Sequence, residues 1–159
     1  MESERFNQFV QLIESIHKSV NKIRLSIAPT LGVKSVHLFW LYELLSHPKG
    51  LTAASLAAES KIDRSLISRE VEELCKRGYV EVVGGGGIKR KNYNSRICLT
   101  EQGRALAQTI TTYAMAVQSA ADVGVSEEEL ASFYMTMEKI STNLLQVAEQ
   151  TKAQKQEAI

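Results

Sequence analysis

Two arginines and two serines near the middle of the chain have the types and spacing to bind an anion. The four residues are Arg64, Ser65, Ser68 and Arg69, and on a helix their side chains would share one face. A guanidinium group can grip a phosphate or a guanine edge with two hydrogen bonds, and a small serine lets the backbone approach closely. The alternative is a solvated helix face, on which the arginines balance the glutamates at positions 70, 72 and 73.

The helix that would carry these side chains has a signal at each end. Asp63 can accept a hydrogen bond from a free backbone N–H at the start, and Gly78 can adopt the left-handed conformation that ends a helix. The opposite face is apolar and consists of Leu66, Ile67, Val71 and Leu74. A helix over 63–77 would be about 20 Å long. A DNA major groove accepts a rod of that size with an arginine face.

A shorter helix is expected just before it, from Thr52 to about Ser60, followed by a turn at 61–62. The Thr52 hydroxyl can cap this helix by accepting from a free backbone N–H. Together with Ser55, it could also bind a phosphate at the helix start. Capping alone is the alternative.

A glycine-rich basic loop follows, between two runs of β-forming residues at 79–83 and 95–99. Its cations are Lys89, Arg90 and Lys91, and Arg96 lies at the edge of the second run. Such a loop over 84–95 would attract a phosphate backbone. Its glycines lack the Gly-Lys-Ser/Thr ending and the following helix of a nucleotide-binding loop. Helices followed by this hairpin predict a winged helix-turn-helix DNA-binding domain over 33–103.

Charge is distributed unevenly along the 159 residues, although the net charge is only +1. Residues 61–96 contain nine lysines and arginines against five acidic residues, whereas residues 122–159 contain three against seven. The positive charge therefore gathers at the proposed reading helix and wing, as expected for a domain that contacts nucleic acid. The hydrophobic content of 44% is sufficient for a core.

Long amphipathic helices are expected on both sides of this domain. The first, over about 4–28, should stop before Pro29, because the residue before a proline is disfavoured in the helical region. Thr100 can cap a later helix, and Ser126 with Glu129 forms a capping box for the last. The DNA-binding domain over 33–103, here called the head, is too small to cover the apolar stripes of three long helices. Regions 1–32 and 104–159 are therefore predicted to pair with those of a second copy of the chain in a homodimer. Two heads would then read a pseudo-palindromic site.

Several other classes of protein are not supported by the sequence. The first residues form no secretory signal and no apolar run has membrane-spanning length, so a soluble cytoplasmic protein is expected. We expect no bound metal, because His17, His37 and His47 are too scattered for a spaced site. No Ser-His-Asp set, carboxylate pair or cofactor motif indicates an enzyme, and no cofactor is expected.

The motifs of the chain resemble those of the MarR family of transcriptional regulators. The matching stretches are LxxL at 41–44, LTxxxLA at 51–57, DRSxxSRxVxxLxxxGYV at 63–80, the basic wing, and LTxxGRAL at 99–106. The resemblance covers most of the chain, because the family also has long terminal helices. It departs at the wing, where family members commonly place an acidic residue two before an arginine and this chain has Lys91-Asn92-Tyr93.

The resemblance implies a mainly α fold with a small β-hairpin wing, dimerisation through the terminal helices, and a homodimeric repressor released by a small ligand or an oxidant. Many relatives bind small aromatic acids between head and dimer helices, where Arg24, His37 and Trp40 could line a cavity. Ordinary core packing is the alternative for Trp40. Some relatives sense oxidants through a cysteine, so Cys75 is a candidate, with a packed, inert thiol as the alternative.

Two other functions remain open at this point. The same scaffold could serve as a protein-interaction module without DNA affinity, since folds do not fix functions. A redox- or metal-sensing regulator of the same fold is the other.

Overall fold

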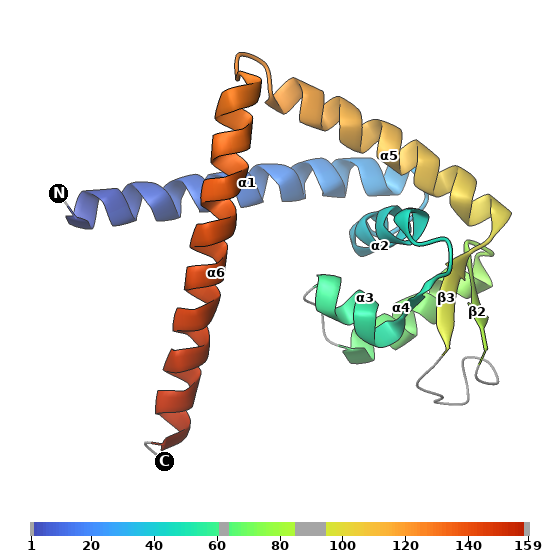
Figure 1. Ribbon diagram of the computed structural model, residues 1–159. Helices are drawn as coiled ribbons and strands as arrows, with labels where there is room; N and C mark the ends of the chain where they lie inside the picture. The colour runs from blue at the N-terminus through green and yellow to red at the C-terminus, as the bar shows by residue number, and fades with distance from the viewer. Residues whose placement is uncertain (1, 61–63, 85–94, 158–159) are drawn as a thin grey trace. The chain divides into compact units, whose positions relative to one another are not determined.

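A computed structural model of the chain describes residues 2–60, 64–84 and 95–157. Within these ranges the chain forms six helices and three short strands (Figure 1). It divides into two compact units, Met1–Ala114 and Met115–Ile159. The first unit contains α1 to α4, the strands and most of α5. The predicted fold, mainly α with a small β-hairpin in a winged helix-turn-helix, is confirmed.

Helix α1 spans Glu2–Thr30, so the prediction that it stops before Pro29 is wrong. Pro29 lies in the last turn, where its missing N–H removes a single helical hydrogen bond. The helix is terminated instead by Gly32, two residues after its last one, whose φ of 67° lies in the left-handed region. Gly32 N–H donates to the Pro29 carbonyl and Val33 N–H to the Ala28 carbonyl, both at 3.0 Å. These two bonds are those of a Schellman motif.

Three helices of the head precede the hairpin, and the two predicted over 52–60 and 63–77 lie within one residue of the prediction at each described end. Helix α2 spans Ser35–Ser46, α3 spans Ala53–Ser60 and α4 spans Arg64–Lys76. The expected N-cap of α4 at position 63 lies outside the described residues. At its other end α4 is closed by the same pair of bonds as α1: Gly78 N–H donates to the Cys75 carbonyl and Tyr79 N–H to the Leu74 carbonyl, both at 3.0 Å.

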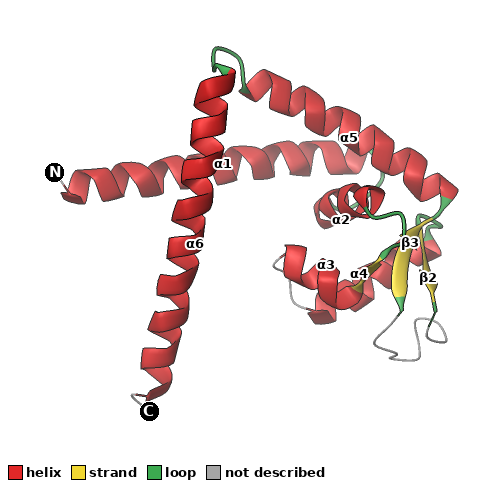
Figure 2. Ribbon diagram, in the orientation of Figure 1, coloured by secondary structure: helices red, strands yellow, loops and turns green. Residues whose placement is uncertain are grey.

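The sheet has three strands rather than the two of the predicted hairpin (Figure 2). Strands β2 (Val80–Val83) and β3 (Arg96–Leu99) pair antiparallel, and β1 (Leu51–Thr52) pairs with the other edge of β3. A two-residue strand is too short for an alternating pattern, which is why the sequence did not reveal β1. Because β1 runs directly into α3, the start of that helix is fixed to the hairpin.

The core of the first unit lies between these helices and the sheet. Trp40, Leu41 and Leu44 of α2 are fully or almost fully buried. They belong to one cluster with apolar residues of α3, α4 and the strands, namely Leu56, Ile67, Val71, Leu74, Val80, Ile97 and Leu99. Burial of the predicted apolar face of α4 leaves its opposite face directed outward.

Helix α5 (Glu101–Ala121) is joined closely to the sheet at its start. Thr100 caps it as predicted, accepting from Gly103 N–H at 3.0 Å, and donates to the Gly78 carbonyl at 2.5 Å. A Cβ on Gly103 would lie 2.7 Å from the Tyr79 carbonyl carbon, well inside van der Waals contact. Glycine at this position therefore allows the helix to approach the backbone that precedes β2.

The second unit consists of the end of α5 and of α6, which spans Glu127–Glu157. The predicted capping box is confirmed, because Ser126 N–H donates to Glu129 at 2.8 Å and Glu129 N–H donates to the Ser126 hydroxyl at 3.3 Å. Hydrogen bonds from Ser126 lower the pKa of the Glu129 carboxyl. The start of α6 is therefore defined by local chemistry alone.

Gly103→Ala should destabilise the protein, although glycine to alanine usually stabilises a helix by about 0.5–1 kcal/mol. The clash with Tyr79 should lower the free energy of unfolding by about 2 kcal/mol or more. Urea unfolding followed through the fluorescence of Trp40 measures this. Gly32→Ala is the comparison, since its added Cβ meets no atom within 4 Å and its cost is limited to the strain of a side chain at a φ of 67°, about 1 kcal/mol. A Gly103→Ala protein as stable as the unaltered one would contradict the tight approach.

Candidate nucleic-acid interface

Helix α4 presents a small polar and cationic face on the side opposite the core. Ile67 and Leu74 are fully buried, whereas Ser68 and Arg69 are exposed. The Arg69 side chain is 76% exposed, and its Nε lies 3.9 Å from a Glu70 carboxylate oxygen. An ion pair that long at an exposed site contributes little. The guanidinium can therefore turn toward a ligand at low cost.

Arg64 and Ser65 belong to the first turn of α4, but their side chains lie outside the part of the structure that is described. The predicted wing cations Lys89, Arg90 and Lys91 also lie outside it, as does most of the loop over 84–95. The strands that lead into and out of this loop are described. They bring residues 83 and 96 directly opposite each other.

Thr52 and Ser55 are used for capping at the start of α3. The Thr52 hydroxyl accepts from Ser55 N–H at 3.0 Å, and the two hydroxyl oxygens are 2.9 Å apart. Both residues are partly exposed. Capping, the alternative weighed from the sequence, is therefore present at the N-terminus of α3, and it does not by itself decide whether the two residues also contact phosphate.

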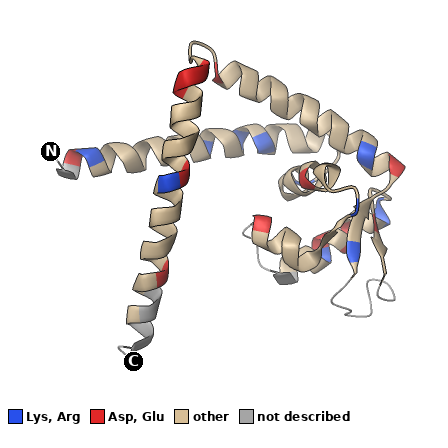
Figure 3. Cartoon of the chain, in the orientation of Figure 1, with Lys and Arg blue, Asp and Glu red and all other residues tan. Residues whose placement is uncertain are grey.

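Arg96 lies on β3 between Thr52 of β1 and Val83 of β2. Its Nη1 donates to the Gly50 carbonyl at 2.9 Å, while the residue as a whole stays exposed. The hydrogen bond holds the guanidinium at the sheet surface. Figure 3 shows cationic residues in blue on β3 and on the helices beside it.

A buried carboxylate on α4 is the feature that sequence reasoning missed. Glu70 was grouped with the acidic residues that balance the arginines, but its side chain is only 8% exposed. Its Oε2 accepts from Lys34 Nζ at 2.8 Å and lies 3.0 Å from His37 Nε2. The interacting residues are 33 and 36 positions apart. A sequence pattern carries no signal for such a contact.

The protonation of this cluster follows from its contacts. Hydrogen bonds to Glu70 and then Glu73 raise the pKa of Lys34, and the bonds from Lys34 lower the pKa of both carboxyls. Burial lowers the pKa of His37, and this outweighs the opposing effect of Glu70. At neutral pH the cluster therefore holds a lysine cation, ionised carboxylates and an uncharged imidazole.

The three residues considered for a ligand cavity lie near the start of α2. Arg24 Nη2 donates to the Ser35 carbonyl at 3.0 Å. His37 and Trp40 are both fully buried, with ring centroids 6.0 Å apart. Within the described residues, Trp40 Nε1 is the buried side-chain polar atom that lacks a hydrogen-bond partner. His37 is already engaged with Glu70.

The two cysteines are partly buried and unpaired. Burial, followed by the charge of Glu72, raises the pKa of the Cys75 thiol. A raised pKa makes the thiolate, the form that reacts with oxidants, scarcer at neutral pH. Among the described residues no group of three histidine, cysteine or acidic side chains could hold a metal. None of the described helices is both long and apolar enough to span a membrane.

Acid should destabilise the folded protein through this cluster. A lowered pKa in the folded state means that the unfolded chain binds more protons, so stability falls as pH decreases. The loss should begin below about pH 6.5 with His37 and continue below about pH 4.5 with the glutamates. Measuring the melting temperature from pH 7 to 5 tests this. His37→Gln keeps a donor but cannot titrate, so its melting temperature should fall less; an equal fall would exclude His37 as the cause.

This arrangement of helices and strands is similar to that of known proteins. Residues 31–91 match the model of the MarR family. A MarR-family transcriptional regulator from Silicibacter pomeroyi is 23% identical, with a TM-score of 0.71 over 83% of this chain and 86% of the other. One from Methanosarcina mazei is 20% identical, with a TM-score of 0.72 over 89% and 99%.

A third similar structure, 20% identical, is a putative MarR-family regulator from Listeria monocytogenes in complex with a 26-mer DNA. Its TM-score is 0.73, over 85% of this chain and 87% of the other. No curated protein matches the sequence. Residues 31–91 therefore match the MarR family, and the chain has the winged helix-turn-helix fold seen in MarR-family transcriptional regulators.

Proposed function

We propose that the chain is a homodimeric, non-enzymatic transcriptional regulator that binds pseudo-palindromic operator DNA. The recognition helix predicted over 63–77, which contains α4, would enter the major groove. The wing over 84–95 would contact phosphate. The observation that carries the proposal is the exposed face with Ser68 and Arg69 on a helix whose other face is buried. The likeness to a regulator solved with DNA supports it.

The dimensions and donors of α4 suit a duplex. Its 13 residues form a rod of about 20 Å. Arg69 can donate two hydrogen bonds to a guanine edge or a phosphate, and Ser68 is small enough to leave room for that approach. Arg64 and Ser65 would add contacts from the first turn, while Thr52, Ser55 and Arg96 would contact phosphate from α3 and β3.

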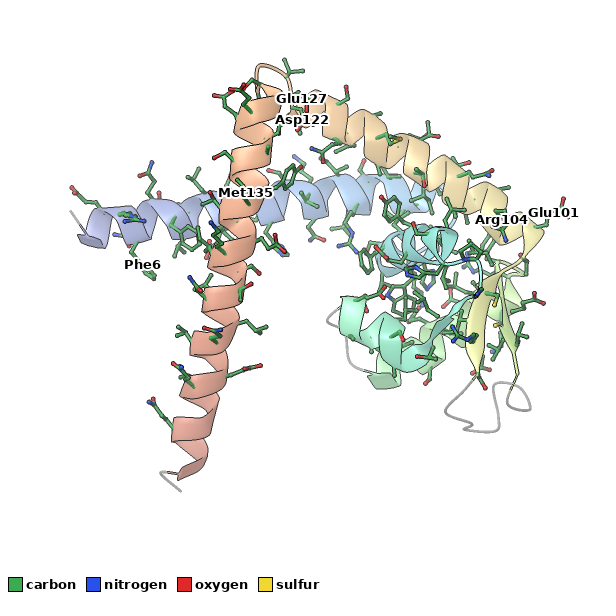
Figure 4. The ribbon with its side chains drawn as sticks, in the orientation of Figure 1. Phe6, Glu101, Arg104, Asp122, Glu127 and Met135 are labelled. Carbon is green, nitrogen blue, oxygen red and sulfur yellow. The ribbon has the colours of Figure 1, made fainter. Side chains whose placement is uncertain are left out.

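The proposed homodimer is supported by apolar side chains that each unit leaves uncovered. On α1 they recur at helical spacing at Ile13, Ile16, Val20 and Ile23, and Phe6 is 66% exposed (Figure 4). In the second unit, α6 exposes Phe133, Leu144 and Val147. Long helices with such stripes need a partner, and a second copy of the chain is the commonest one. Two heads would then reach grooves about 34 Å apart.

We further propose that the protein is a repressor, and that a small ligand or an oxidant releases it from its operator DNA. A change at the junction of α1 and α2 would alter the spacing of the two heads, and a mismatch with the fixed groove spacing would weaken both half-sites together. Arg24, His37 and Trp40 are the candidate ligand residues, and the unpartnered Trp40 Nε1 supports a polar ligand atom there. Cys75 is the candidate for an oxidant.

Arg69→Ala should weaken binding to a preferred duplex by about 1–3 kcal/mol, because it removes a bidentate donor. The duplex can be obtained by selection from a random pool with the unaltered protein, and affinity measured by gel shift. Arg104→Ala is the matched control, since this exposed cation lies on α5 (Figure 4). Equal affinities of the two variants would remove Arg69 from the interface. An unaltered protein that retains no random duplex at low salt would favour the protein-interaction module instead.

Ile16→Glu should convert the dimer to a monomer, because it places a charge in the apolar stripe of α1. Sedimentation equilibrium measures the mass directly. Gln11→Glu introduces the same charge on another side of the helix and should leave the dimer intact. A monomeric unaltered protein, or a dimeric Ile16→Glu protein, would count against dimerisation through this stripe.

A further inference from the structure

Glu70 occupies an unusual position on α4, since it follows the exposed Arg69 and precedes the buried Val71. Its carboxylate accepts hydrogen bonds from two residues of another segment, Lys34 Nζ at 2.8 Å and His37 Nε2 at 3.0 Å. Those residues lie immediately before α2 and in its first turn. The side chain therefore joins the reading helix to the connection between α1 and α2.

The direction of the bond from His37 follows from its second nitrogen. The Lys34 backbone N–H donates to His37 Nδ1 at 3.4 Å, so Nδ1 must accept. The ring proton therefore lies on Nε2 and points at Glu70. In this tautomer the neutral His37 ring accepts from the Lys34 backbone N–H at the start of α2 and donates to the Glu70 carboxylate on α4.

The network continues along one side of α4. Lys34 Nζ also contacts Glu73 Oε2 at 2.5 Å, and Glu73 Oε1 lies 3.3 Å from Arg77 Nη2. Arg77 Nη1 in turn donates to the Gly32 carbonyl. Positions 70, 73 and 77 follow one another at helical steps of three and four, so they share a face. Two turns of α4 are thus tied to residues 32–37.

These hydrogen bonds restrict the rotation of α4 more narrowly than apolar packing does. A helix held by aliphatic side chains alone can rotate or slide with a small loss of contact. Hydrogen bonds between fixed partners allow a single arrangement, and a functional face needs that support from the residues behind it. A rotation of α4 would move the Arg69 guanidinium away from any base edge in the groove.

We propose that Glu70, held by Lys34 and His37, positions α4 for sequence-selective reading of DNA. These residues touch no base or phosphate and act through Arg69 and its neighbours. The inference rests on the proposed DNA-binding function. It assigns sequence selectivity partly to a carboxylate, a group that by charge alone opposes DNA binding.

The two effects of Glu70, repulsion of DNA by its charge and positioning of α4, predict opposite changes in DNA affinity when the carboxylate is removed. Glu70→Gln and Glu72→Gln each remove one negative charge from α4, but the Glu72 side chain is exposed and forms an ion pair with Lys76 on the same helix, at 3.1 Å. If charge alone matters, both variants should bind every duplex at least as tightly as the unaltered protein does. If Glu70 positions the helix, its replacement should weaken binding to the preferred duplex.

The measurement is fluorescence anisotropy with two labelled duplexes of equal length, one selected from a random pool by the unaltered protein and one scrambled. Glu72→Gln should keep its preference for the selected duplex. Glu70→Gln should bind the scrambled duplex undiminished and lose about tenfold or more on the selected one. All assays are run well below the melting temperature of each variant.

His37 provides a second test that involves no change of charge at neutral pH. His37→Gln keeps a donor for Glu70 and should retain most of the preference, whereas His37→Leu should lose it. This pair decides the matter if Glu70→Gln fails to fold.

The inference is overturned if Glu70→Gln tightens binding to both duplexes as Glu72→Gln does, or if the two His37 variants show the same preference. An unaltered protein that prefers no duplex would instead refute the proposed function, and the inference with it.

Discussion

A single buried carboxylate, that of Glu70, links α4 to the start of α2 in the head. Ionised Glu70 costs free energy to remove from water, and it is tolerated because Lys34 and His37 satisfy it at 2.8 and 3.0 Å. Removing either partner would leave a buried charge incompletely bonded, so the contact favours one relation of α4 to α2 over its neighbours. Around this contact, Ile67, Val71 and Leu74 supply the apolar burial that stabilises the helix, and the polar contacts add a directional restraint on its rotation.

The same constraint explains how one helix can serve two purposes. Residues 70, 73 and 77 are bound to the segment before α2, while positions 68 and 69 face outward one residue away. Sequence reading under the proposed function needs both, because a donor on a loosely held helix would meet a base edge only part of the time. The segment that holds α4 also ends α1, which carries the uncovered apolar stripe. A change in the proposed dimer helices would therefore reach the reading helix through these polar contacts as well as through the core cluster, to which Ala28 of α1 also belongs.

Much of this fold could be predicted from the sequence, since its signals are local. Thr52, Thr100 and Ser126 cap the helices they were expected to cap, and Gly78 ends α4. Pro29 misled the prediction, because a proline in the last turn removes only one bond and Gly32 sets the end. Strand β1 was too short to show a pattern. Glu70 could not be recognised, because a glutamate beside Arg69 looks like a solvated charge until residues 34 and 37 are brought against it. The DNA contacts themselves stay a prediction.

The proposed function requires the outward face of α4 to lie in a major groove. Protection of guanine N7 from methylation on a selected duplex tests it directly, because this atom is exposed only in that groove. Two protected clusters are expected about 10 base pairs apart, one for each head of the proposed dimer, with protection at one guanine per cluster lost in Arg69→Ala. A bound duplex whose guanines all remain open to methylation, or are protected identically by Arg69→Ala, would contradict it.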